Sequence, residues 1–138
     1  MTSGEIRDLA QRYTAAWNSQ DPANVAAFYA PQGSLRVNDA NPAVGRDAIA
    51  EVAQSFMTAF PDLHLTMDDV HPEGDGAIYH WTFAGANTGP GGAGRRVRFS
   101  GFEIWSLGAD GLIAESRGHF DQAAYQRQLE RGVEPGSH

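Results

Sequence analysis

The sequence predicts an α+β fold, with N-terminal helices packed on a curved antiparallel sheet and a further helix at the C-terminal end. Apolar residues recur at helical spacing only in the first 60 residues and near the end of the chain. The segment between them, from Leu63 to Phe120, consists of long strand-like runs. Within it, Asp110-Gly111 separates two apolar runs, which is a strong hairpin signal. Helices on the concave face of a bent sheet leave a pocket, and the side chains facing it are candidates for function.

The composition excludes several classes of partner. The chain has 138 residues, the size of one domain, and we expect a single domain over 1–138 with a core at about 3–131 and a loose tail at 132–138. The net charge of −7 argues against binding to nucleic acid or to an anionic membrane surface. The chain has no cysteine, so it lacks a disulfide framework and a thiolate nucleophile. Neither a membrane-spanning run nor a signal peptide is recognisable, and we expect a cytoplasmic protein.

The first helix has a clear start signal. Thr2 and Glu5 have the spacing of a capping box, and the helix should end near Asn18. Its apolar face consists of Ile6, Leu9, Ala10, Tyr13 and Trp17.

Two more helices are expected before the strands begin. Asp21 is placed as an N-cap and Pro22 as the first residue of a short second helix, which the Pro-Gln-Gly segment 31–33 should end. A third helix should span about 46–60, because Pro61 does not allow it to continue.

Five strands and a final helix complete the predicted fold. The strands are expected at Ser34–Asp39, Leu63–His71, Ala77–Asn87, Val97–Leu107 and Leu112–Phe120. The final helix is expected at Asp121–Arg131, followed by Gly132 as a stop signal. The glycine-rich segment 88–94 lacks the lysine and the following helix of a phosphate-binding loop, so it is interpreted as a flexible connection.

Strand pairing suggests which side chains meet. In the hairpin centred at Asp110, Glu103 should lie opposite Ser116 or Arg117. In the preceding pair of strands, centred near residue 91 or 92, His80 should lie about opposite Glu103. These pairings predict a row of His80, Glu103 and Ser116 across three strands.

Because side chains alternate along a strand, either of two rows of side chains could form the inner face of the sheet. One row contains Ile78, His80, Thr82, Phe99, Gly101, Glu103, Trp105, Ser116, Gly118 and Phe120. The other contains Tyr79, Trp81, Phe83, Arg98, Phe102, Ile104, Arg117 and His119. Both rows include aromatic residues, and a register error of one residue exchanges them.

Three segments resemble a known family. They read AQRYTAAWNSQDPANVAAFYAPQGSL, GRDAIAEVAQSFMTAFPDLHLTMDDV and RRVRFSGFEIWSLGADGLIAESRGHFD. The chain resembles the SnoaL-like polyketide cyclases, also called ester cyclases, over roughly residues 3–131. The most specific blocks are Phe60–Leu63 and Gly94–Gly101. The resemblance implies the cone-shaped fold of the nuclear-transport-factor-2-like, cystatin-like superfamily.

The resemblance also implies roles for individual residues. In the related ketosteroid isomerases, a tyrosine of the first helix and an acid of the third long strand form an oxyanion hole, and a second acid follows the first strand. These positions correspond here to Tyr13, Glu103 and Asp39. The row that contains His80, Glu103 and Ser116 would then face the cavity.

The sequence also departs from the family pattern. The family commonly places two acids at the end of the last strand; here Gly118 stands at the first position and only Asp121 matches the second. A frequent Thr-His pair is replaced by Ala86-Asn87. The Arg-x-Asp pattern of the related epoxide hydrolases falls on segment 78–80, Ile-Tyr-His, so epoxide hydrolysis is not expected.

Each candidate residue also has a structural interpretation. Glu103 is either a pocket acid with a raised pKa or a surface acid. His80 is either a partner of Glu103 or a structural histidine, and Tyr13 is either a proton donor or a core residue. Asp121 is either a second acid or the N-cap of the last helix, and His119 lies either at the pocket mouth or on the surface.

The leading hypothesis is a cofactor-free enzyme that transfers a proton α to the carbonyl group of a hydrophobic compound, as a cyclase (a lyase) or an isomerase. Its catalytic residues would be Glu103, His80, Tyr13, Asp121 and Asp39. Its substrate-binding residues would be Trp17, Phe56, Phe60, Trp105, Ser116, Phe120 and His119.

The alternative hypothesis is a non-catalytic module that binds a small molecule or forms a dimer, and Gly118 favours it. No metal site is expected, because the histidines and acids lack ligand spacing. A homodimer is expected through the outer face of the sheet, if that face bears Tyr79, Trp81, Phe83, Phe102 and Ile104.

Overall fold

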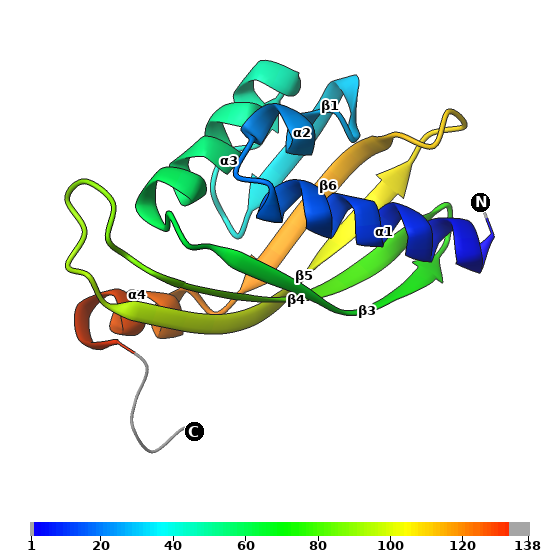
Figure 1. The fold of residues 1–138 in the computed structure, drawn as a ribbon. Coiled ribbons are helices and arrows are strands. Elements are labelled where there is room, and N and C mark those ends of the chain that lie inside the picture. Colours follow the sequence, from blue (N-terminus) through cyan, green and yellow to red (C-terminus); the bar gives the residue numbers. More distant parts are fainter. Residues whose placement is uncertain (1, 133–138) are drawn as a thin grey trace.

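The computed structural model describes residues 2–132, so the predicted tail lies outside the described residues except for Gly132 (Figure 1). The helices are α1 (Ser3–Asn18), α2 (Pro22–Ala26), α3 (Arg46–Ala59) and α4 (Gln122–Arg131). The strands are β1 (Tyr29–Val37), β2 (Ala43–Val44), β3 (His64–Glu73), β4 (Gly76–Ala86), β5 (Arg96–Leu107) and β6 (Ile113–Phe120). The α+β class and the order of the long elements are therefore confirmed.

The strands form one curved sheet in the order β2-β1-β6-β5-β4-β3. Helices α1, α2 and α3 cover one face of it, and α4 lies beside the beginning of β5 (Figure 1). Strands β3 to β6 form the expected antiparallel meander, but β1 pairs with β6 in parallel. The sheet is therefore mixed, and its one parallel pair could not be predicted because it joins segments far apart in the chain and no local turn signal marks it.

The helix caps are those that the sequence predicts. Thr2 accepts from the Glu5 N–H at 3.1 Å, and the Glu5 carboxylate accepts from the Thr2 N–H at 3.0 Å, which completes the capping box. Asp21 caps α2 and Asp121 caps α4 through their side-chain oxygens. These local bonds fix the start of α1 and therefore the orientation of its buried face.

The segment after α2 differs from the prediction. Helix α2 ends at Ala26, and Tyr29 already belongs to β1, where it pairs with Ile113. The Pro31–Gly33 segment produces an irregularity inside the strand rather than a helix stop. Pro31 has no N–H to offer the ladder, and a Cβ on Gly33 would stand 2.9 Å from the Ile113 carbonyl oxygen. The predicted strand therefore started five residues too late.

The register of β4 decides which aromatic residues form the core. Tyr79 pairs with Glu103, and His80 pairs with Phe102, so β4 is shifted by one residue from the predicted pairing. Tyr79, Trp81 and Phe83 consequently face the helices and are buried. The predicted apolar outer face is therefore wrong for three of its five residues, since only Phe102 and Ile104 remain on that side and are half-buried.

Candidate active site

Glu103 lies at the centre of the inner face of the sheet and is only 7% exposed. Three side chains donate hydrogen bonds to its Oε1 atom: Ser116 Oγ at 2.6 Å, Tyr13 O–H at 3.0 Å and Trp105 Nε1 at 3.1 Å. No donor among the described residues reaches the other carboxyl oxygen, Oε2. One oxygen is therefore held by the protein, and the other makes no hydrogen bond with the described residues.

A second layer of hydroxyl groups supports this arrangement. Tyr29 at the start of β1 shares a 2.8 Å hydrogen bond with Tyr13 of α1, and both tyrosines are fully buried. The Tyr13 ring packs edge-on against Trp105 and Tyr79, with ring centroids 5.2 and 5.6 Å apart. These contacts hold the Tyr13 hydroxyl where it donates to Glu103.

Burial is the largest influence on the titration of this cluster. Removal from water raises the pKa of Glu103, and the hydrogen bonds from Ser116, Trp105 and Tyr13 act in the opposite direction. Burial and the nearby Glu103 carboxylate also raise the pKa values of Tyr13 and Tyr29. The two phenols are therefore neutral hydrogen-bond donors at neutral pH.

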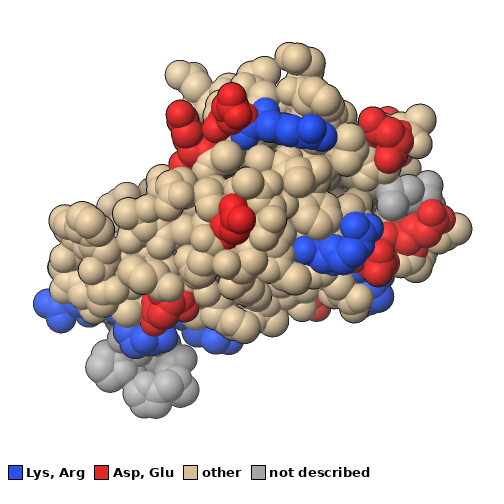
Figure 2. Space-filling model, turned by 45° about the horizontal axis from the view of Figure 1, so that its top comes forward, with Lys and Arg blue, Asp and Glu red and all other residues tan. Residues whose placement is uncertain are grey.

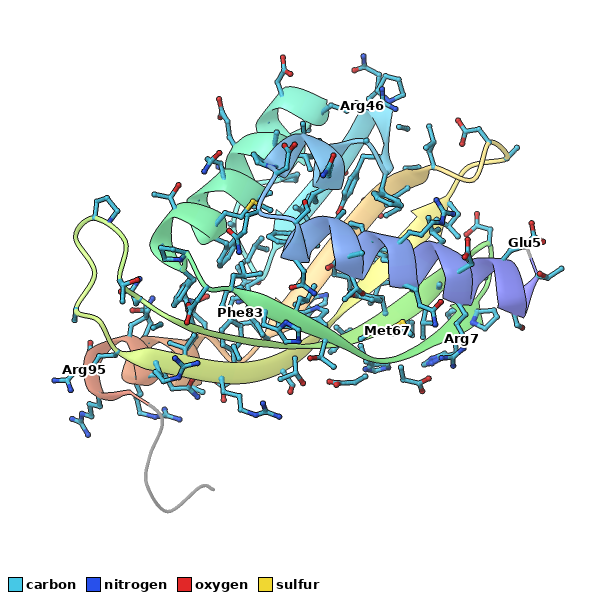
Figure 3. All side chains as sticks on the ribbon, viewed as in Figure 1. Glu5, Arg7, Arg46, Met67, Phe83 and Arg95 are labelled. Carbon is cyan, nitrogen blue, oxygen red and sulfur yellow. The ribbon has the colours of Figure 1, made fainter. Side chains whose placement is uncertain are left out.

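Glu103 borders a cavity of about 60 Å³ between the sheet and the helices. Its walls consist of Trp17, Leu35, Val37, Val52, Phe56, Leu65, Trp81, Phe83, Phe99, Glu103, Gly118 and Phe120. The side chain of Phe83 lies between β4 and α3, where its ring centroid is 5.9 Å from that of Phe56 (Figure 3). Among these described wall residues Glu103 alone is charged. Four of the wall residues, Val37, Val52, Phe56 and Phe120, are half-buried, and the others are buried.

Two buried indole groups of wall residues, the Nε1 atoms of Trp17 and Trp81, make no hydrogen bond of ordinary geometry among the described residues. The Trp17 indole nevertheless lies close enough to the Tyr13 hydroxyl to act on the pKa of Tyr13, which it lowers against the larger effect of burial. A buried N–H without a partner costs about 1–3 kcal/mol. In contrast, the indole of Trp105 donates to Glu103.

His80 does not lie near Glu103. It points to the outer face of the sheet, where its ring is 5.5 Å from His71 and 6.0 Å from Phe102. The predicted pairing with Glu103 and the predicted position in the cavity are therefore wrong. The cause is the one-residue shift of β4, because Tyr79 occupies the place across from Glu103.

Three other predicted residues gather at a separate, more open groove. Asp39, His119 and Asp121 line it together with residues of β5 and the start of α4. Asp121 accepts a hydrogen bond from the Ala124 N–H at 3.0 Å and so caps α4, as the structural one of its two interpretations predicted. Asp39 is exposed beyond the end of β1 instead of continuing its inner face, and His119 is exposed with its ring 5.1 Å from Phe102. None of the three lines the cavity beside Glu103.

The predicted binding residues divide into two groups. Trp17, Phe56 and Phe120 line the cavity. The other inward-facing residues, Phe60, Trp105 and Ser116, are buried behind the wall, where Trp105 and Ser116 hold Glu103.

Sequence reasoning missed several wall residues and one member of the hydroxyl layer. Trp81 and Phe83 were placed on the outer face because of the register error, and Tyr29 was placed in a helix. The register of β4 depends on which residue lies midway between the paired residues of β4 and β5. The sequence analysis left residues 91 and 92 open, and only Gly91 gives the observed pairing of Tyr79 with Glu103.

Gly118 lies directly across the strand pair from Glu103, so the predicted pairing of Glu103 with Ser116 or Arg117 was wrong. The cause is an irregularity between Ser106 and Leu107, which shifts the register of the hairpin. A Cβ at this position would be 3.7 Å from Glu103 Cγ and 3.4 Å from the Arg36 carbonyl oxygen, both tolerable separations. The acid that the family resemblance places here would therefore stand beside Glu103. Its absence leaves Glu103 without a second carboxyl in the described cavity wall.

Other kinds of site find little support in the described chain. Within residues 2–132, no three histidine, aspartate or glutamate side chains gather closely enough to hold a metal ion. None of the helices in that range has the length and hydropathy that a membrane crossing requires. On the face shown in Figure 2, basic and acidic patches lie interspersed on a largely uncharged surface.

Solved structures share this fold. A SnoaL-like protein from Jannaschia sp. CCS1 superimposes with a TM-score of 0.81 at 20% identity, covering 95% of each chain. TsrD from Streptomyces laurentii has a TM-score of 0.79 at 26% identity, covering 94% of this chain and 97% of its own. A protein with a ketosteroid isomerase-like fold from Catenulispora acidiphila, in complex with trimethylamine, has a TM-score of 0.79 at 14% identity, covering 89% and 92%.

No curated protein matches the sequence significantly. A family model, that of the SnoaL-like polyketide cyclases, matches residues 7–129. This range includes Tyr13, Glu103 and Ser116, and it leaves only short segments at the two ends. The chain therefore belongs to the SnoaL-like polyketide cyclase family.

Proposed function

We propose that the protein is an acid–base catalyst that transfers a proton α to the carbonyl group of an uncharged, apolar compound. The observation that supports this most directly is the carboxyl group of Glu103, which borders an apolar cavity with one oxygen held and the other free. Membership of a polyketide cyclase family is consistent with such chemistry. The reaction would be an aldol-type cyclisation or an isomerisation.

In the proposed reaction, Oε2 of ionised Glu103 removes a proton from the carbon next to the carbonyl, which leaves an enolate and a protonated carboxyl group. In an isomerisation, the carboxyl group returns that proton to a different carbon of the enolate. In a cyclisation, the enolate carbon forms a bond to a second carbonyl carbon, and the resulting alkoxide takes the proton. The protein recovers its ionised carboxylate in both cases.

The three donors to Oε1 would act as positioning residues. They keep the Glu103 carboxyl group from rotating, so that Oε2 stays directed to the substrate. This changes the role that the family resemblance implies for Tyr13, which is fully buried behind the cavity wall and donates to Glu103 rather than to a substrate oxygen.

Burial also suits Glu103 to the role of a base. A raised carboxyl pKa means that the Glu103 carboxylate has a greater proton affinity than an exposed one, which suits a base that removes a proton from carbon. The described wall contains no lysine, arginine or histidine, so a substrate anion would find no counter-charge beside Glu103. An uncharged substrate is therefore favoured.

Proton exchange tests the proposal without knowledge of the natural substrate. We expect the protein to accelerate deuterium exchange at the α-carbon of one or more cyclic ketones, measured by NMR. Glu103→Gln keeps an oxygen for the three donors but removes the base, and should lower the rate by about 100-fold or more. The matched control is Glu115→Gln on the exposed side of β6, which should leave the rate unchanged. Exchange no faster than in buffer across the panel would contradict the proposal.

A second candidate function is a module that binds the same kind of compound without turnover. Gly118 favours it, because the position across from Glu103 lacks the acid that the family pattern includes. Saturable binding of a ketone without faster α-proton exchange would support this second function over the first.

A homodimer through the outer face of the sheet remains a proposal. Its basis is smaller than the sequence suggested, since Phe102 and Ile104 on that side are half-buried and Phe102 is flanked by His80 and His119. Sedimentation equilibrium should give twice the chain mass at micromolar concentration, and Phe102→Asp should shift it to the monomer. A monomer of the unaltered protein would contradict it.

A further inference from the structure

We infer that the missing side chain at Gly118 gives the cavity a subsite for an apolar substituent on the reacting carbon of the substrate, so that the protein selects α-substituted ketones over unsubstituted ones. This inference rests on the proposed function, because it concerns the substrate of the same cavity. It makes Gly118 a residue that determines specificity by direct contact with the substrate, whereas Glu103 would act on the proton.

The first argument is that the fold does not require a glycine at position 118. Gly118 is buried inside β6, and its backbone φ lies outside the positive range that favours glycine. A Cβ added there would meet no atom closer than 3.4 Å. A glycine inside a strand lowers stability, so a glycine that the backbone does not need calls for another explanation. At the other buried glycines of the described residues an added Cβ would stand 1.7 to 3.2 Å from a neighbouring atom; they are Gly33, Gly76, Gly85 and Gly89.

The second argument is that the space left by the missing side chain opens on the cavity. Gly118 pairs with the inward-facing Glu103 and belongs to the cavity wall. Apart from its chain neighbours, a Cβ there would have only Glu103 Cγ, at 3.7 Å, and the Arg36 carbonyl oxygen, at 3.4 Å, within 4 Å among the described residues. A carbon atom in a close-packed interior is surrounded on all sides. The place is therefore open to a group of a bound ligand.

Gly101 on the neighbouring strand shows how this sheet uses the space over a glycine. Gly101 pairs with Phe120, which lies two residues from Gly118 along β6. The indole ring of Trp81 fills the space over it, since a Cβ on Gly101 would stand 2.7 Å from that ring. No ring among the described residues comes within 4 Å of the corresponding place at Gly118. A glycine in a strand often marks the close approach of another group, and at Gly118 the ligand would supply that group.

The surroundings of Gly118 determine which kind of group would fit. The nearest wall residues along the paired strands are Val37, which pairs with Gly118, and Leu35 and Phe120, all of which are apolar. An alkyl group therefore suits the place better than a polar one. In the position of the missing Cβ it would lie beside the Glu103 side chain, and so belong to the part of the ligand next to the reacting carbon. Because the cavity has a volume of only about 60 Å³, a single methyl group should affect the fit.

The first experiment compares three ketones by isothermal titration calorimetry of the whole protein. They are 2-tetralone, 1-methyl-2-tetralone, which has a methyl group on an α-carbon, and its isomer 6-methyl-2-tetralone, which has the methyl group on the far ring. We expect the 1-methyl compound to bind about 3- to 5-fold more tightly than 2-tetralone, as the burial of one methyl group predicts, and more tightly than its isomer. Equal or weaker binding of the 1-methyl compound, or no binding of it, would overturn the inference.

The second experiment fills the subsite by the substitution Gly118→Ala. This change should weaken binding of 1-methyl-2-tetralone about 10-fold and binding of 2-tetralone less than twofold, because only the substituted ketone needs the space. The matched control is Gly4→Ala, which adds the same methyl group on the exposed side of α1, 4.0 Å from the nearest atom, and should leave both affinities unchanged. Equal effects of Gly118→Ala on the two ketones would contradict the inference.

Stability separates this role from a purely structural one. Alanine has less conformational freedom to lose on folding than glycine, so Gly118→Ala should raise the midpoint of urea denaturation of the unliganded protein. The variant would then be more stable than the unaltered protein but poorer at binding the substituted ketone. A lower midpoint would show that the fold needs glycine at this position, and would overturn the inference.

Deuterium exchange at the methyl-bearing α-carbon separates this inference from the proposed function. If the unaltered protein prefers 1-methyl-2-tetralone in binding, and Gly118→Ala removes that preference, but exchange is no faster than in buffer, the subsite stands and the proposed catalysis fails. If exchange is rapid while the preference is absent, the catalysis stands and the subsite fails. Rapid exchange together with the preference would support both.

Discussion

The two faces of strands β4 and β5 contain similar residues in very different surroundings. On the inner face, Tyr79 pairs with Glu103, and aromatic rings exclude water from the carboxyl group. On the outer face, His80 pairs with Phe102 and remains partly accessible to water. A titratable group beside an aromatic ring is thus common to both faces. What distinguishes the inner one is burial together with three donors directed at a single oxygen.

The largest expected contrast comes from replacing one titratable group on each face. Glu103→Gln should lower the rate of α-proton exchange by about 100-fold or more, since the proposed base is lost. His80→Gln should change it less than twofold, because its side chain points away from the cavity. The ketone exchange assay measures both. A comparable loss in His80→Gln would mean that the outer face takes part in the chemistry.

A substitution should also destabilise the protein more on the inner face than on the outer face, because the inner face is more closely packed. Gly101→Ala places a Cβ 2.4 Å from the His119 carbonyl oxygen and 2.7 Å from the Trp81 ring, and should destabilise the protein by about 3 kcal/mol. Ser100→Ala, one residue away on the outer face, removes a 2.7 Å hydrogen bond to Thr82 and should cost about 1 kcal/mol. Urea denaturation measures both changes. Equal destabilisation would contradict the close packing inferred for the inner face.

On the inner face, the carboxyl group of Glu103 should also make the free energy of unfolding depend on pH. Burial raises the pKa of folded Glu103 above its ordinary value of 4.5, so the folded state binds a proton more tightly than the unfolded state. As a result, the free energy of unfolding should fall as the pH rises from about 4.5 to the raised pKa, and then level off. Glu103→Gln should remove this decline, as followed by urea denaturation at a series of pH values. A decline of equal size in the variant would assign it to other groups.

The smallest expected effect concerns the donors to Oε1. The Ser116 hydrogen bond favours the ionised form of Glu103, so Ser116→Ala should raise the pKa of that carboxyl group further. Because the ionised form is the proposed base, the midpoint of the pH–rate profile should move to higher pH. Ser106→Ala on the same hairpin, whose side chain makes no contact with Glu103, is the control. A midpoint that moves down, or moves equally in both variants, would contradict the assigned role.

Sequence reasoning succeeded where local chemistry determines the structure. The capping box of Thr2 and Glu5, the N-caps at Asp21 and Asp121 and the hairpin turn at Asp110-Gly111 all involve residues within a few positions of one another. The predicted sharing of one face by Glu103 and Ser116 was also correct, because a short turn joins their strands.

Sequence reasoning failed where a long stretch of chain separates two strands that pair with each other. The connection between β4 and β5 is rich in glycine, and moving its centre by one residue exchanges Tyr79 for His80 opposite Glu103. The parallel pairing of β1 with β6, which places the Tyr29 strand beside Ser116, joins segments separated by α3 and four strands. The inward position of Trp81 depends on the register of β4, which only the three-dimensional structure settles.

Gly118 fixes how many exchangeable protons the cavity can store. With glycine across from it, Glu103 has no second carboxyl group in the described cavity wall, and in the proposed reaction it would transfer one proton per cycle. An aspartate in the same place would form a dyad whose two carboxyl groups titrate as a unit, with apparent pKa values that belong to the pair. The tolerable separations around Gly118 mean that this change needs little backbone movement. One glycine thus separates a site with a single acid from one with two that share a proton.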